Sequence, residues 1–129
     1  MYFKVDFQYT LFMPIVRILS FKYAFDGIWT ALKEEPNLII HLVAAFIALL
    51  MGFYFKITEV EWLTIIITIG LVISLELTNT AIESIVDGLT QEHHPAAKIA
   101  KDISAGAVLV AAGTAAIVGI IIFLSYIHI

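Results

Sequence analysis

Four polar side chains recur at helical spacing within one stretch of the sequence: Glu76, Asn79, Glu83 and Asp87. Successive residues of an α-helix are about 100° apart, so the four lie within an arc of roughly 80° on one helix face. The stripe begins directly after a long apolar run, which would carry it from the aqueous boundary into a membrane. Ionisable groups at such depth are costly and are usually functional.

Charge balance around this stripe favours a bound cation. Glu76 and Glu83 could simply pair with Lys98 or Lys101 of a neighbouring helix and set the helix packing, and this structural alternative stays open. However, the acids outnumber the nearby lysines, because Glu35 adds a further carboxylate. The excess of negative charge favours a divalent cation.

The residue types predict phosphoryl transfer. Carboxylates such as Glu35 and Glu83 suit Mg²⁺, which typically binds through one or two carboxylates, keeps several waters and accepts phosphate oxygens. Lys101 would neutralise phosphate charge, and Glu76, nearest the lipid, would accept a proton from a hydroxyl at the membrane surface. The sequence has no glycine-rich phosphate loop of the Walker or protein-kinase pattern, which excludes those scaffolds.

The functions of three histidines, the adjacent pair His93 and His94 and the separate His41, are less clearly indicated by the sequence. His93 and His94, beside Glu92, suggest a metal site, but they lack the i, i+4 spacing of a zinc-binding helix. We expect them to be solvated or to lie near phosphate, in a loop that ends at Pro95. His41 lies just inside the first apolar stretch, where packing is its ordinary role, and its function is left open.

Composition indicates that these residues are positioned by membrane helices. The chain has 129 residues, of which 61% are hydrophobic, and this leaves room for a single membrane-embedded domain, residues 1–129. A membrane span needs about 20 apolar residues, and we predict helices at 37–55, 62–89 and 97–127. The second helix continues past its apolar run to Leu89 and should project toward the membrane surface.

The region before the first span, residues 1–35, is predicted to contain a surface helix. From Met13 to Glu35, apolar clusters alternate with charged residues, as in an amphipathic helix at the membrane interface. Pro36 disfavours a helical conformation in the residue before it, so a turn should lead into the first span. No secretory pattern is present at the N-terminus, and we expect the whole chain to be retained.

Basic residues and small residues predict orientation and assembly. Lysines and arginine before the first span, and Lys98 and Lys101 between the second and third, place both regions in the cytoplasm. The chain would therefore be a multi-pass protein of the cell membrane with its chemistry on the cytoplasmic side. The third span is rich in alanine and glycine, which allow close helix packing, and we expect a homo-oligomer.

The remaining composition excludes other classes. A net charge of −4, with long uncharged stretches, is not the footprint of a nucleic-acid-binding protein. The chain has no cysteine, so it has no disulfide, thiolate metal site or cysteine nucleophile.

The run from Glu76 to Asp87, E-L-T-N-T-A-I-E-S-I-V-D, followed by His94-Pro95 and A-K-D at 100–102, resembles the prokaryotic diacylglycerol kinase family. The resemblance covers about residues 17 to 127. The chain is most similar to the Gram-positive branch, usually assigned as undecaprenol kinase, at E-x-N-x-x-I-H (35–41), S-L-E (74–76) and K-I-A-K-D-I-S-A-G-A-V (98–108). The family implies an all-α homotrimer with three transmembrane helices and a surface helix per chain, and active sites shared between subunits.

The resemblance also implies roles for single residues. Glu76 takes the general-base position at the lipid hydroxyl, and Glu35 and Glu83 take the positions that bind the metal accompanying ATP. The positions near the nucleotide are Tyr23, Glu35, Glu83, Glu92, His93, His94, Lys101 and Asp102. Asn79 and Asp87 match polar supporting positions.

The favoured function is transfer of the ATP γ-phosphate to undecaprenol, with Mg²⁺ as cofactor. Diacylglycerol is the alternative acceptor, since the two reactions would share these residues and differ in the groove for the lipid tail. A hypothesis of another class is a non-enzymatic ion or proton pathway along the polar stripe. Its weakness is the stretch from Trp62 to Ile73, which offers only Thr64, Thr68 and Gly70 to a conducting route.

Overall fold

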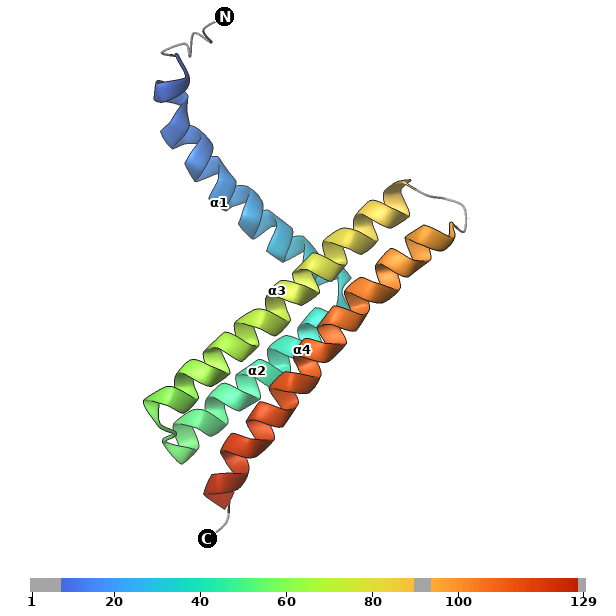
Figure 1. Cartoon of the computed structure of the whole chain (residues 1–129). Helices are drawn as coiled ribbons and strands as arrows, with labels where there is room; N and C mark the ends of the chain where they lie inside the picture. The colour runs from blue at the N-terminus through green and yellow to red at the C-terminus, as the bar shows by residue number, and fades with distance from the viewer. Residues whose placement is uncertain (1–7, 90–93, 128–129) are drawn as a thin grey trace, which may run out of the picture. The chain divides into compact units, whose positions relative to one another are not determined.

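The computed structural model describes residues 8–89 and 94–127, with side chains described from Ser20 onward. These residues form helices only: α1 (Gln8–Glu34), α2 (Pro36–Phe55), α3 (Glu59–Leu89) and α4 (Pro95–Ile127) (Figure 1). The chain divides into two compact units, α1 up to Glu34 and a three-helix bundle from Glu35 onward. The predicted all-α architecture is confirmed.

Helices α2, α3 and α4 are each long and apolar enough to cross a membrane, so the chain is a multi-pass membrane protein. They contain 20, 31 and 33 residues, and their bounds lie within three residues of the predicted ones. At a rise of 1.5 Å per residue, α3 and α4 are about 46 and 50 Å long, against a hydrocarbon core of about 30 Å. As predicted, α3 is therefore long enough to project beyond the lipid.

Helix α1 forms the first unit by itself. It starts at Gln8, five residues before the predicted Met13, and contains 27 residues. Its side chains from Ser20 to Thr30 are all exposed, and the Lys33 ammonium lies 5.1 Å from the centre of the Trp29 ring. The location of this helix at the membrane surface stays a prediction.

The predicted turn before Pro36 is present. Glu35 has an extended backbone (φ −113°, ψ 101°) and precedes α2. Pro36 occupies the first position of α2, where its missing N–H would have no helical acceptor in any case. The turn places Glu35 at the N-terminal end of the bundle.

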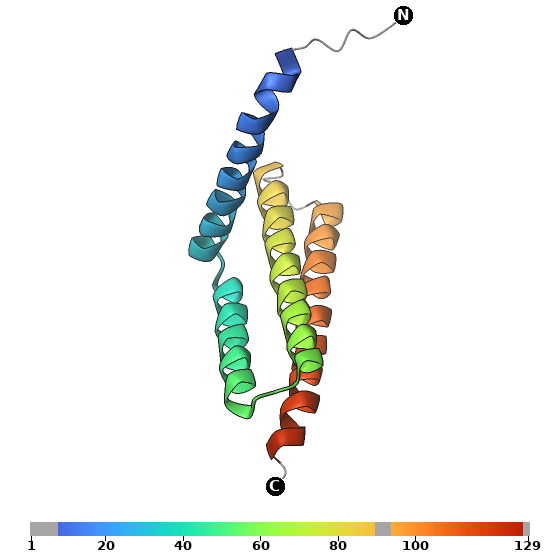
Figure 2. The ribbon, with the colours of Figure 1, turned by 90° about the vertical axis from the view of Figure 1, so that its left-hand side faces the viewer.

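A small apolar core closes the opposite end of the bundle. Within the bundle α3 packs chiefly against α4 (Figure 2), and Ile57, Ile65, Ile122 and Phe123 are buried together. A Cβ atom at Gly52 would lie 2.8 Å from the Trp62 ring, so only glycine allows this approach of α2 to α3. The close contact helps to set the register between the two helices.

Hydrogen bonds to Glu61 connect the chain segments at this end. The Thr58 N–H and hydroxyl each donate to Glu61 Oε2 at 2.8 Å, which caps the start of α3. The Tyr126 hydroxyl donates to the same oxygen at 2.7 Å and so joins the end of α4 to α3. This end of the bundle is held by both packing and hydrogen bonds.

Candidate functional site

The polar stripe on α3 runs from the protein interior to solvent. Glu76 and Asn79 are buried, Glu83 is half-buried and Asp87 is exposed. Glu76 is only 2% exposed, although it carries a carboxyl group. Burial along the stripe therefore increases from Asp87 to Glu76, and its descent into a membrane stays a prediction.

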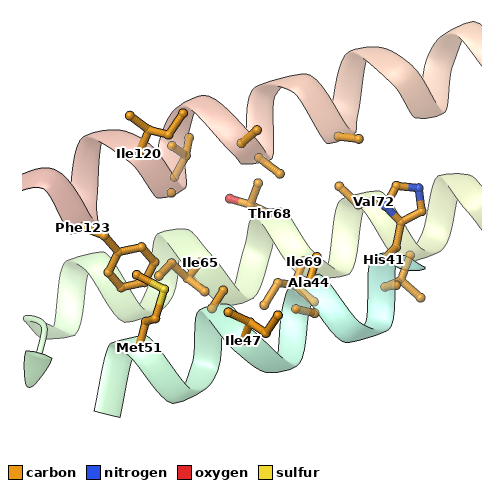
Figure 3. A pocket seen from close by; sticks show the side chains of 18 residues that line it. His41, Ala44, Ile47, Met51, Ile65, Thr68, Ile69, Val72, Ile120 and Phe123 are labelled. Atoms are coloured by element: carbon orange, nitrogen blue, oxygen red, sulfur yellow. The ribbon is translucent and has the colours of Figure 1, made fainter. Parts of the chain in front are cut away.

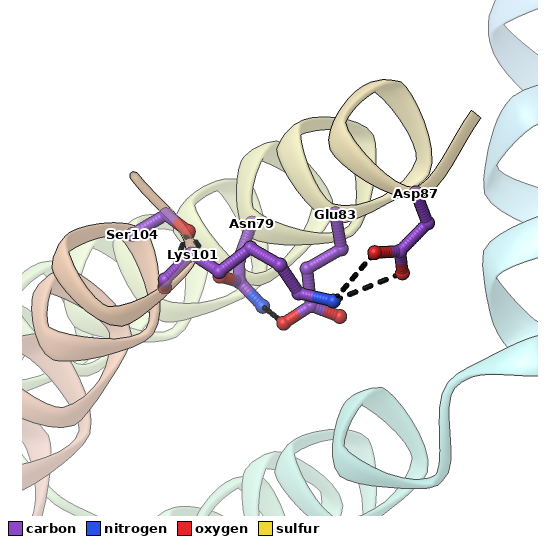
Figure 4. A network of polar contacts seen from close by, with 5 residues as sticks. All are labelled: Asn79, Glu83, Asp87, Lys101 and Ser104. Atoms are coloured by element: carbon purple, nitrogen blue, oxygen red, sulfur yellow. Dashed lines mark hydrogen bonds and ion pairs between the residues drawn. The ribbon is translucent and has the colours of Figure 1, made fainter. Parts of the chain in front are cut away.

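A buried hydrogen-bonded chain joins α4 to this stripe (Figure 4). The Ser104 hydroxyl donates to Asn79 Oδ1 at 2.6 Å. The amide nitrogen of Asn79 donates in turn to Glu83 Oε1 at 3.1 Å. Because the Ser104 donor occupies the amide oxygen, the NH₂ group of Asn79 is turned toward the Glu83 carboxylate. Asn79 thereby orients Glu83.

The lysines pair with acids at the aqueous end of the helices. Lys101 Nζ lies 2.8 and 2.9 Å from the two carboxylate oxygens of Asp87, and Lys98 forms an ion pair with Asp102 on α4. Lys98 and Lys101 therefore form ion pairs with Asp102 and Asp87, respectively. Among residues 20–89 and 94–127, neither Glu76 nor Glu83 forms an ion pair with a lysine.

The partner of Glu76 comes from α2. His41 Nε2 lies 4.0 Å from Glu76 Oε2, and the side chains of His41 and Glu76 are 22% and 3% exposed. This contact was not predicted from the sequence, which shows only that His41 lies in an apolar helix. The spacing from Glu35 to His41 was visible, but the register between α2 and α3 was not.

Glu35 and Glu83 lie at the same end of the bundle. Helices α2 and α3 are antiparallel (Figure 1), and His41 meets Glu76. Glu35, which directly precedes α2, is six residues before His41, and Glu83 is seven residues after Glu76, which corresponds to about 9 and 10.5 Å along the helix axes. The two residues are therefore at a similar height along the bundle, beyond the His41–Glu76 pair.

The donor chemistry of this end fits Mg²⁺. Carboxylate oxygens are hard ligands, and Mg²⁺ often uses only one or two of them, with water and phosphate completing its coordination. Within the described part of the chain, no group of three or more acidic or histidine side chains forms a complete metal cage. By residue type, Glu35 and Glu83 suit the two-carboxylate mode, and their role as metal ligands stays a prediction.

The other residues predicted to contact a nucleotide belong to different parts of the chain. His94 is described and exposed, and its Nδ1 accepts a hydrogen bond from the Ala96 N–H at 3.3 Å. Tyr23 belongs to the separate α1 unit and is 66% exposed. Glu92 and His93 lie outside the described residues. The bundle itself brings together Glu83, Asp87 and Lys101.

An apolar recess of about 460 Å³ lies between α2, α3 and α4. His41 is at one end of this recess, and Met51 and Phe123 are at the other (Figure 3). Thr68 also lines it, but the Thr68 hydroxyl bonds to the Thr64 carbonyl of its own helix. Among the described residues that line the recess, His41 is the one ionisable side chain.

Comparison with known proteins identifies relatives over most of the chain. The family described as prokaryotic diacylglycerol kinase matches residues 22–123. An undecaprenol kinase from Bacillus subtilis is 48% identical over 105 residues, which cover 81% of this chain and 85% of that protein. A diacylglycerol kinase from Synechocystis is 40% identical over 79% of this chain and 59% of that protein. A diacylglycerol kinase from Haemophilus influenzae is 33% identical over 73% and 80%, respectively.

Replacing Ser104 by alanine should destabilise the bundle by about 1 kcal/mol, because the buried Asn79 carbonyl would lose its donor. Denaturation in mixed micelles, followed by circular dichroism, measures the change in the free energy of unfolding. Ser84→Ala, at an exposed position of α3, is the control and should change that free energy by less than about 0.5 kcal/mol. Equal stability of the two variants would contradict a stabilising role for the Ser104–Asn79 bond.

Proposed function

The chain belongs to the prokaryotic diacylglycerol kinase family of membrane lipid kinases, and on this premise we propose that it phosphorylates undecaprenol at the expense of ATP. The product would be undecaprenyl phosphate. The relative named undecaprenol kinase is more similar to the chain (48% identity) than the two diacylglycerol kinases (40% and 33%), which supports undecaprenol over diacylglycerol as the acceptor.

The observation that carries the proposal is the position of Glu76. Its buried carboxyl group lies beside His41, which lines the apolar recess. Glu76 is also the innermost residue of the polar stripe that leads to water. A lipid alcohol needs this arrangement, because its tail belongs in an apolar environment and its hydroxyl must meet a phosphate donor from the aqueous side. The recess suits part of the lipid tail.

In the proposed reaction, Glu76 takes the hydroxyl proton while the hydroxyl oxygen attacks the γ-phosphorus of ATP. The bond between the γ-phosphorus and the bridging oxygen breaks, and ADP leaves. Exclusion of water by the apolar surroundings would favour transfer to the lipid over hydrolysis of ATP.

The aqueous end of the bundle would hold the nucleotide. Glu35 and Glu83 would bind the Mg²⁺ that accompanies ATP, and this ion, when bound, would neutralise phosphate charge. Asn79 would keep the Glu83 carboxylate oriented through the 3.1 Å hydrogen bond. Lys101 would bind phosphate as a point charge, held in place by Asp87 in the free protein.

The remaining proposed contacts follow the family positions. The residues proposed to meet the nucleotide, besides Glu35, Glu83 and Lys101, are Tyr23, Glu92, His93, His94 and Asp102. We further propose that the site faces the cytoplasm and that the chain is a homotrimer with sites shared between subunits. Apolar side chains that are exposed on all three bundle helices support burial in lipid or against further copies.

Purified protein in lipid micelles with Mg-ATP should phosphorylate undecaprenol faster than diacylglycerol when both are offered in parallel. Glu76→Gln should lower kcat by at least about 100-fold, since the amide cannot accept the proton. Its affinity for ATP should stay within about twofold, because Glu76 lies on the lipid side of the site.

Labelled lipid separated by chromatography measures the transfer, and equilibrium binding measures ATP affinity. Preferential labelling of diacylglycerol would reassign the acceptor. Labelling of neither lipid, or full activity of Glu76→Gln, would contradict the proposed reaction or the proposed base.

Replacing Glu35 or Glu83 by glutamine should raise the Mg²⁺ concentration for half-maximal activity by about tenfold or more, because each change removes a charged oxygen ligand. Titration of activity with Mg²⁺ at constant free ATP measures this concentration. Glu34→Gln, next to Glu35 in sequence, is the matched control and should leave it unchanged. If the Mg²⁺ concentration for half-maximal activity is the same in all three variants, neither Glu35 nor Glu83 binds the metal.

A further inference from the structure

His41 is an ionisable residue within the membrane part of the bundle that the mechanism above leaves unused. It lies in the second turn of α2, and its side chain lines the end of the recess nearest Glu76 (Figure 3). Within the described bundle, Glu76 is the one acidic residue whose carboxylate lies within 4.0 Å of the imidazole. The contact connects two helices, so it depends on the fold and not on local sequence.

The geometry allows proton exchange between the two groups. A separation of 4.0 Å is longer than a hydrogen bond, but a small side-chain rotation or one bridging water would connect the atoms. Catalytic hydrogen bonds are often long in the free enzyme and shorten when substrate binds. A neutral imidazole both donates and accepts hydrogen bonds.

The position of Glu76 creates a need for such a group. After phosphoryl transfer its carboxyl group would carry the proton in a site that is 2% exposed. The next polar group along the stripe, Asn79, has an amide that bonds Ser104 and Glu83 and is not a base. The His41 side chain, by contrast, is 22% exposed in the single chain, and it lies in the second turn of α2, near the end of the bundle that carries Glu35.

Resting on the proposed function, we propose that His41 is the positioning and proton-accepting partner of Glu76. In the free enzyme its imidazole N–H orients the Glu76 carboxylate toward the end of the recess. During the reaction the hydroxyl O–H bond breaks, the new O–P bond forms, and the bond to the ADP oxygen breaks. The proton passes from the hydroxyl to Glu76, from Glu76 to neutral His41, and then to water, which restores the carboxylate for the next turnover.

Steady-state kinetics on the full-length protein test this role, with Mg-ATP and undecaprenol in lipid micelles. His41→Ala should lower kcat by about 10- to 100-fold, within or just below the usual range of acid–base contributions. The KM values for ATP and undecaprenol should change by less than about twofold. Added imidazole, which fits the space left by the side chain, should restore a large part of kcat in His41→Ala but none in Glu76→Gln.

Two further variants separate this role from a structural one. His41→Gln keeps a hydrogen-bond donor but cannot carry the proton, so its kcat should lie below that of the wild type and should not respond to imidazole. Thr64→Val removes a hydroxyl that bonds to the Val60 carbonyl near the start of α3, away from His41, and Thr64 does not line the recess. This control should retain wild-type kcat.

Wild-type kcat in His41→Ala would overturn the inference. A loss of activity that imidazole does not restore would also overturn it, because His41 would then have a packing role only. Full activity in His41→Gln would overturn it as well, because a hydrogen-bond donor without proton transfer would then be sufficient. If the wild-type protein phosphorylates no lipid alcohol, the proposed function fails, and that outcome is distinct from a failure in the His41 variants.

Discussion

The carboxyl group of Glu76 is almost completely buried, in a helix that is mostly apolar from Trp62 up to this residue. Burying an ionisable group costs several kcal/mol unless polar partners compensate. His41 on α2 lies 4.0 Å from this carboxyl group, and the Ser104–Asn79 hydrogen bond lies about one turn further along α3. The cost of burial is a reason to expect a function at this position, since packing alone would be better served by an apolar side chain.

The two ends of the bundle have different physical roles. At one end, close packing of Gly52 against Trp62 and hydrogen bonds to Glu61 join all three helices. At the other end, α3 and α4 extend past the apolar region and carry charged side chains to solvent. The packed end sets the register of the helices, and this register brings His41 beside Glu76 at the depth where polar and apolar parts meet.

Much of this arrangement is predictable from sequence, because it depends on local rules. Apolar length gives the three spans, Pro36 gives the turn before α2, and the spacing of Glu76 to Asp87 gives one polar face. Contacts between helices are not predictable in this way. The Ser104–Asn79 bond and the His41–Glu76 contact depend on the relative height of helices, which in turn depends on side-chain packing such as Gly52 against Trp62. Likewise, the pairing of Lys101 with Asp87 depends on how α4 packs against α3.

Chemical modification of carboxyl groups tests most directly whether a lipid alcohol binds at Glu76. Dicyclohexylcarbodiimide is an apolar reagent that reaches carboxyl groups inside membranes, and mass spectrometry of peptides identifies the modified residue. We expect modification of Glu76 to abolish activity, and undecaprenol to protect Glu76 while leaving modification of the exposed Asp87 unchanged. If saturating undecaprenol leaves the rate of Glu76 modification unchanged, the lipid hydroxyl does not bind at this carboxyl group and the proposed site is wrong.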